Sequence, residues 1–163
     1  MPMTKALLAA GAAALLMGAA QPVDLPGHYD PNNAYARAAR GELPVAKLYE
    51  DDQAIAYLVH NPYTVGHFLV VSKVSHARNF LEVEPDVLMH MWAVAQRVAR
   101  AEIVALHADG FVIRSNAGAA GATPVFHIHV ITMRSGVPMD EKRPEKSLAE
   151  LEPIAAQVRA ALQ

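Results

Sequence analysis

Short runs of mostly apolar, often β-branched or aromatic residues, separated by turn residues, recur along the chain and predict β-strands. These runs occupy residues 46–50, 54–59, 67–73, 111–115 and 123–133. Residues 85–106 and 148–162 instead repeat their apolar positions at helical spacing. Asn32 or Asn33 can cap a further short helix that runs through Arg40 and that Gly41 ends. We expect an α+β fold in which helices cover one side of a single antiparallel sheet of five strands.

The first 20 residues have the pattern of a secretory signal peptide. Lys5 gives a positive start, residues 6–16 are apolar, and small residues precede a cleavage site before Gln21. The apolar stretch is shorter than the roughly 20 residues that cross a bilayer, so we expect no stable membrane insertion after cleavage. An uncleaved alanine-rich anchor helix is the alternative. Residues 21–32 then form a proline-rich linker and residues 33–163 the folded domain of an exported protein, periplasmic or secreted.

Composition narrows the classes of function. The 163 residues include 14 Lys and Arg against 16 Asp and Glu, with no basic cluster of the kind that follows a nucleic-acid backbone. We therefore expect a small-molecule ligand and no nucleic acid. The sequence contains no cysteine, which excludes disulfides, thiol catalysis and cysteine-based zinc sites.

The clearest candidate chemistry lies in the last predicted strand, where His127 and His129 stand two residues apart in an apolar run. Side chains alternate across a strand, so both imidazoles lie on one face, about 7 Å apart along it. Upstream, residues 116–123 are mostly small and could bring backbone N–H groups close to an anion. A neutral imidazole beside such a loop can attack or carry a proton near pH 7. A merely structural pair of half-buried histidines fits the same spacing.

With these elements in order, the sequence resembles the histidine-triad (HIT) superfamily, in particular its small nucleotide-binding branch typified by phosphoramidases. The resemblance runs from about Asn33 to Thr132 and extends to the final helix. It depends on five short segments in family-like order, residues 41–44, 48–52, 67–70, 116–118 and 125–130. The resemblance implies a HIT-like antiparallel five-stranded sheet with one long helix and a C-terminal helix.

The resemblance also implies a mechanism. His129 stands where the family has the histidine that attacks the α-phosphorus, forming a nucleotidyl-histidine that water hydrolyses, and His127 stands where it has a supporting histidine. The candidates for substrate binding are Asn116, Gly118, Thr123 and His67. We also expect a small phosphorylated ligand and no cofactor. We expect a homodimer that pairs across the long helix and continues the sheet between subunits.

Several positions depart from the family pattern. Ile131 replaces the third histidine and cannot protonate a leaving group. Val59 replaces the acidic residue that holds the ribose hydroxyls, and less polar residues replace further pocket positions at Thr123, Ala119 and Ala120. We therefore expect weak nucleotide binding and, for an enzyme, a leaving group that departs without a third imidazole.

Three functions stay open at this point. The first is a hydrolase or transferase that acts at a phosphoryl centre through His129. The second is a catalytically inactive HIT-fold ligand-binding protein, which the replacements at Ile131 and Val59 favour. The third is a transition-metal site made by His67, His127 and His129. The charged residues 139–146 are predicted to be a solvated loop.

Overall fold

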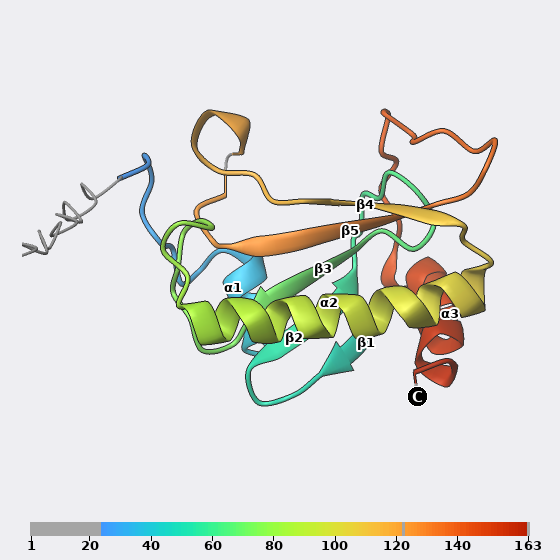
Figure 1. Cartoon of the computed structure of the whole chain (residues 1–163), viewed down its shortest axis with the longest axis horizontal. Helices are drawn as coiled ribbons and strands as arrows, with labels where there is room; N and C mark the ends of the chain where they lie inside the picture. The colour runs from blue at the N-terminus through green and yellow to red at the C-terminus, as the bar shows by residue number, and fades with distance from the viewer. Residues whose placement is uncertain (1–23, 122, 163) are drawn as a thin grey trace, which may run out of the picture.

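The computed structural model describes residues 24–121 and 123–162, and the predicted leader and its cleavage site lie outside this part. Five strands form one antiparallel sheet (Figure 1), which confirms the predicted α+β fold. In chain order the elements are α1 (Ala34–Ala39), β1 (Lys47–Glu50), β2 (Ala54–Leu58), β3 (Phe68–Ser72), α2 (Pro85–Leu106), β4 (Gly110–Arg114), the 3₁₀ turn η1 (Gly118–Ala120), β5 (His127–Met133) and α3 (Leu148–Ala160).

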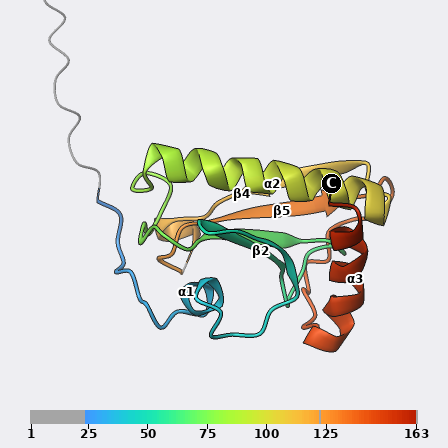
Figure 2. The same cartoon turned by 90° about the horizontal axis from the view of Figure 1, so that it is seen from below.

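The sheet has the strand order β1-β2-β3-β5-β4, so β5 lies between β3 and β4 and pairs with both. The long helix α2 runs along one face of the sheet, and α3 stands at the end of the sheet (Figure 2). The core between them is built from apolar side chains of the sheet and both helices, including Ala56, Phe68, Ile128, Val130, Met91, Val98, Leu151 and Val158. No helix among residues 24–121 and 123–162 is long and apolar enough to span a membrane.

The expectation that helices cover only one side of the sheet is wrong for α1. Figure 2 shows α1 on the face opposite α2. Its small side chains Ala38 and Ala39 pack there against residues of β2 and β3, namely Ile55, Tyr57, Leu69 and Val71. Every residue of β2 and β3 is buried, because both faces of these strands are covered. Their continuous apolar runs, rather than alternating ones, are the sequence signal for such burial.

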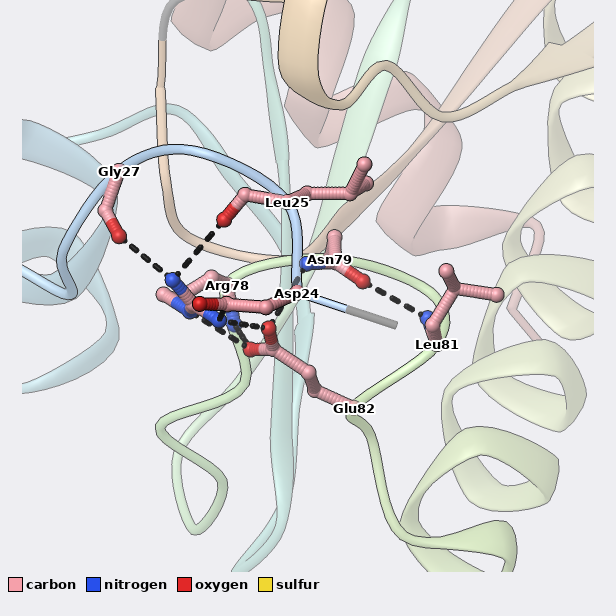
Figure 3. Close-up of polar contacts among 7 residues, drawn as sticks. All are labelled: Asp24, Leu25, Gly27, Arg78, Asn79, Leu81 and Glu82. Atoms are coloured by element: carbon pink, nitrogen blue, oxygen red, sulfur yellow. Dashed lines mark hydrogen bonds and ion pairs between the residues drawn. The ribbon is translucent and has the colours of Figure 1, made fainter. Parts of the chain in front are cut away.

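Arg78 ties the segment before α1 to the loop before α2 (Figure 3). Its guanidinium donates to the carbonyl oxygens of Leu25 at 3.1 Å and Gly27 at 2.5 Å. It also pairs with the carboxylates of Asp24, at 2.6 Å, and Glu82. One side chain thereby satisfies two backbone carbonyls that belong to no regular element. Residues 24–27 are thus held against the body of the domain.

Glu102 of α2 is a fully buried carboxyl group, and neither of its oxygens has a hydrogen-bond partner in the part of the chain described. Burial raises the pKa of Glu102 well above its usual value of 4.5, and the nearby Thr132 hydroxyl and Arg134 charge offset only part of the rise. The folded protein therefore holds this proton more tightly than the unfolded chain does. Stability is lost as the pH rises above 4.5 toward the raised pKa.

We expect Glu102→Gln to remove this dependence on pH. The amide cannot ionise, so the free energy of unfolding of the variant should exceed that of the wild type by about 1–3 kcal/mol above neutral pH. The two proteins should converge below pH 4.5, the usual pKa of the group. Urea unfolding over a pH series measures the difference, with the exposed Glu145→Gln as control. A pH dependence unchanged by Glu102→Gln would contradict the assignment.

Candidate functional site

The two histidines of β5 lie side by side on the sheet face opposite α2, as the alternation of the strand predicts. His127 and His129 are 4% and 7% exposed, whereas Ile128 and Val130 between and beyond them pack into the core beneath α2. The Nε2 atoms of His127 and His129 are 3.1 Å apart. The two side chains thus lean toward each other, so that their ring nitrogens reach hydrogen-bond distance although their backbone positions are two residues apart.

A third imidazole joins them from the neighbouring strand. His67 immediately precedes β3, and its Nε2 lies 3.0 Å from Nδ1 of His129. Phe68 pairs with Val130, so one further step of the same register puts His67 opposite Ile131. This imidazole lies beside the position where the family pattern has its third histidine. It lies on the Nδ1 side of His129, however, rather than on the Nε2 side.

The two ends of this histidine chain determine its tautomers. His127 Nδ1 is 2.6 Å from the carbonyl oxygen of Val125, which can only accept, so Nδ1 of His127 carries the proton. At the other end the backbone N–H of Tyr63 donates to Nδ1 of His67 at 3.3 Å, so His67 carries its proton on Nε2. His67 then donates to His129, and His129 donates through Nε2 to His127. Each of the three neutral imidazoles therefore uses one nitrogen as a hydrogen-bond donor and the other as an acceptor, and the hydrogen bonds all run from His67 toward His127.

Burial keeps these rings neutral. It lowers the pKa of His67 and of His129 to about 3, and it also lowers the pKa of His127. Positive charge adds to the effect at His129, where neighbouring imidazoles and then the guanidinium groups of Arg114 and Arg143 disfavour the imidazolium form. The His129 ring is therefore uncharged across the physiological range of pH, which is one requirement for a nucleophilic imidazole.

The same geometry does not form a metal centre. Among the described residues, no three His, Asp or Glu side chains form a group that could hold a metal ion. The two nitrogens of His129 point at two different rings, so the lone pairs of the three imidazoles do not converge on one point. The hypothesis of a transition-metal site made by these histidines lacks support in the structure.

A polar pocket of about 300 Å³ lies in front of His127 and His129. The predicted residues Asn116 and Thr123 line it, and Gly118 and His67 do not. Its other polar side chains are Tyr35, Tyr63, Arg114 and Arg143. The Tyr35 ring of α1 also packs on His127, with 4.5 Å between ring centroids. The pocket therefore joins α1, β4, β5 and three loops around the histidine pair.

Glycines shape the small-residue loop beside this pocket. Gly118 has φ +55°, a left-handed conformation that costs glycine little, and a Cβ there would lie 3.7 Å from the side chain of Leu25. A Cβ on Gly121 would come within 2.8 Å of Cβ of Asn116, so only glycine allows this approach. Gly118 thus gives the loop its path, while Gly121 and Asn116 form part of the pocket wall.

Sequence reasoning missed the two arginines and two tyrosines of the pocket. Arg114 pairs directly with His129 across the β4–β5 ladder, so a correct strand pairing would have placed it on the same face. No strand pairing or sequence motif indicated that Arg143 would reach the pocket. It lies in residues 139–146, which are an exposed loop for most of their length, but Arg143 is half-buried and bonds to Asn61. Val59, the replacement for the ribose-binding acid, is buried among apolar side chains.

Comparison with known proteins gives one consistent family. The sequence matches the HIT domain over residues 40–136. It is 34% identical over 96 residues to adenylylsulfatase HINT3 of Arabidopsis thaliana, covering 59% of this chain and 48% of that protein. The chain thus spans about half the length of this relative.

Solved structures agree. A HIT-like protein involved in cell-cycle regulation from Bartonella henselae superposes with a TM-score of 0.75 at 32% identity, covering 82% of this chain and 99% of that one. A hypothetical histidine triad nucleotide-binding protein from Sulfolobus tokodaii gives a TM-score of 0.71 at 27% identity, covering 78% and 90%. Both structures share the fold, and one of them is named a hypothetical nucleotide-binding protein.

The tautomers of the histidine chain are directly measurable. In long-range ¹⁵N NMR spectra we expect His127 as the Nδ1–H tautomer and His67 and His129 as Nε2–H tautomers, all neutral between about pH 5 and pH 8. His67→Ala should convert His129 to a mixture of tautomers, because its Nδ1 loses the donor that fixes it. A titration of His129 near the ordinary value of 6.5 would contradict the effect of burial.

Proposed function

The chain belongs to the HIT domain family, and from this premise we propose that it is a hydrolase or transferase acting at a phosphoryl centre through a covalent His129 intermediate. The observation that carries the proposal is the neutral His129 ring, which lines a polar pocket beside a loop of small residues. Its relatives support a nucleotide as one part of the substrate, since one is named a nucleotide-binding protein and another an adenylylsulfatase.

Attack requires one rearrangement of protons. In the resting chain Nε2 of His129 donates to His127, so its lone pair is not available. His129 can carry the proton on Nδ1 instead, if it donates to His67 and His67 moves its own proton to Nδ1. This costs the 3.3 Å hydrogen bond from Tyr63 and the 3.1 Å hydrogen bond from His129 to His127, each on the order of 1 kcal/mol for a neutral bond. His67 is therefore a positioning residue for the nucleophile.

The chemical steps then follow from these atoms. His129 Nε2 forms a bond to phosphorus, while the bond from phosphorus to the leaving group breaks and its electron pair goes to the leaving group. In the second step water attacks phosphorus, and the N–P pair returns to Nε2 of His129. His127 Nε2, an acceptor in the resting chain, takes the proton of the attacking water and then releases it to solvent, so that His127 and His129 both end as neutral imidazoles.

Ile131 limits the leaving group. Its side chain is fully buried and apolar, so it donates no proton. His67 lies opposite Ile131 but contacts the Nδ1 side of His129 and does not line the pocket, so it is not placed to protonate a departing group. We infer that the enzyme acts on substrates whose leaving group departs as a weakly basic anion or carries its own proton.

A homodimer is part of the proposal. β4 is an edge strand of the sheet, and its outward residues Phe111 and Ile113 are 55% and 37% exposed. Together with Trp92 and Ile103 of α2 they line an apolar groove of about 370 Å³. An unpaired edge beside exposed apolar side chains favours pairing with a second copy about a two-fold axis, which would continue the sheet between subunits.

The catalytic proposal makes opposite predictions for two substitutions. His129→Ala should abolish turnover of both adenosine 5′-phosphoramidate and an activated nitrophenyl ester of AMP, because both need the nucleophile. Ile131→His should raise turnover of the phosphoramidate toward the roughly 10²–10⁴-fold that a proton donor contributes, with little effect on the ester.

Steady-state kinetics measures both rates, and Ile131→Val is the control that keeps the site apolar. If His129→Ala lowers neither rate and Ile131→His raises neither, the histidine strand is structural. The protein is then a ligand-binding member of the fold.

The dimer has its own test. Phe111→Glu should convert the dimer to a monomer, because the two-fold axis brings two carboxylates into one apolar interface. Light scattering during gel filtration measures the mass, and Val74→Glu is a control at a side chain 54% exposed on the loop after β3. A wild-type mass equal to one chain would refute the dimer.

A further inference from the structure

Two guanidinium groups contact one aromatic ring at the pocket. The Cζ atom of Arg114 lies 4.5 Å from the centroid of the Tyr63 ring, and that of Arg143 lies 4.4 Å from the same centroid. Arg114 comes from the end of β4, and Arg143 from the exposed loop 139–146. Contact with Arg114, together with both positive charges, lowers the pKa of Tyr63. Segments far apart in sequence thus place two cations in one polar pocket.

The position of Arg143 is fixed by hydrogen bonds. Its Nε donates to the carbonyl oxygen of Asn61 at 3.0 Å, and one terminal nitrogen donates to the Asn61 side chain at 3.1 Å. The backbone N–H of Asp140 donates to the carbonyl oxygen of Tyr63 at 2.7 Å, which joins the two loops. Ordered in this way, Arg143 loses little further entropy when it binds a ligand.

Neither arginine has a carboxylate partner within the described chain. Arg40, Arg78 and Arg159 each form an ion pair there, whereas Arg114 and Arg143 form none. The pocket has no Asp or Glu among its described lining residues, and Nε of Arg114 is buried without a hydrogen-bond partner. Both arginines are half-buried and face a polar pocket without a carboxylate, so this arrangement favours an anionic ligand.

The arginines lie beside the nucleophile. Arg114 is the cross-strand partner of His129, and cross-strand partners project from the same face of a sheet. The charges of Arg114 and Arg143 both lower the pKa of His129, which reflects their proximity. A group bonded to a phosphorus at His129 would therefore come within the field of two cations.

We propose that Arg114 and Arg143, held on the Tyr63 ring, form a subsite that binds the departing oxyanion of the substrate. The inference rests on the proposed function and deepens it. When His129 bonds to phosphorus, the bridging P–O bond breaks and its electron pair stays on the leaving oxygen. The two guanidinium groups stabilise that charge without a proton transfer, which offsets the missing donor at Ile131. The substrates are phosphoric anhydrides whose leaving group is phosphate or sulfate.

Three substrates with a common AMP moiety test this. ADP and adenylyl sulfate release an oxyanion, whereas adenosine 5′-phosphoramidate releases an amine. In an Arg114→Gln, Arg143→Gln double variant we expect kcat/KM for at least one anhydride to fall by about 10²-fold or more. The phosphoramidate should lose much less than that anhydride, and Lys142→Gln, the control that removes an exposed charge from the same loop, should leave all three rates unchanged. The anhydride that loses more identifies the oxyanion.

The corresponding pair of lysine substitutions should recover part of the anhydride rate, since lysine restores the charge but not the planar fork. Equal losses on all three substrates, or no loss on either anhydride, would overturn the subsite. Thermal unfolding of each variant shows whether it is folded, and the lysine pair provides the comparison if the glutamine pair is not.

A binding measurement separates this inference from the proposed function. Inorganic phosphate and inorganic sulfate, titrated separately by calorimetry, should bind the wild type and Lys142→Gln, and should bind the double glutamine variant about tenfold or more weakly. If no substrate is turned over but this difference holds, the catalytic proposal fails and the anion subsite stands. If neither anion binds the wild type, or both bind the double variant equally well, the subsite is refuted.

Discussion

The position of β5 between β3 and β4 is the constraint on which the site depends. Hydrogen bonding on both edges holds His129 opposite Leu69 on one side and Arg114 on the other. The alternation of the strand then sends Ile128 and Val130 into the core, so the histidines cannot turn away without unpacking it. The same register brings His67 within hydrogen-bond distance of the nucleophile. One face of β5 thus packs into the core, and the opposite face carries the histidine cluster.

The family resemblance alone describes this site as a triad that has lost one member. The structure adds where the polar groups around His129 lie. An imidazole is present beside Ile131, but it comes from before β3 and contacts the far nitrogen of His129. Positive charge enters from β4 and from a distant loop through Arg114 and Arg143. Hydrogen bonding around His129 is therefore maintained, and two guanidinium groups share its pocket.

Much of the fold was predictable because period and turn chemistry are local signals. The strands, the long helix and the common face of His127 and His129 follow from them. The location of α1 did not follow, because a short alanine-rich helix shows no distinct polar side that would indicate which layer it joins. Arg143 was equally inaccessible, since its position depends on Asn61, 82 residues away in sequence. Local patterns thus predicted the elements, and long-range contacts determined the walls of the pocket.

The anchoring of residues 24–27 by Arg78 bears on where the folding unit begins. The family match starts at residue 40, yet Tyr35 of α1 packs on the His127 ring and the Leu25 side chain lies beside Gly118. Both residues precede that boundary and support the wall of the pocket. A fragment cut at the family limit would keep every histidine of the cluster and lose part of the surface that shapes their ligand. The packed structure around the pocket therefore extends beyond the segment by which its family is identified.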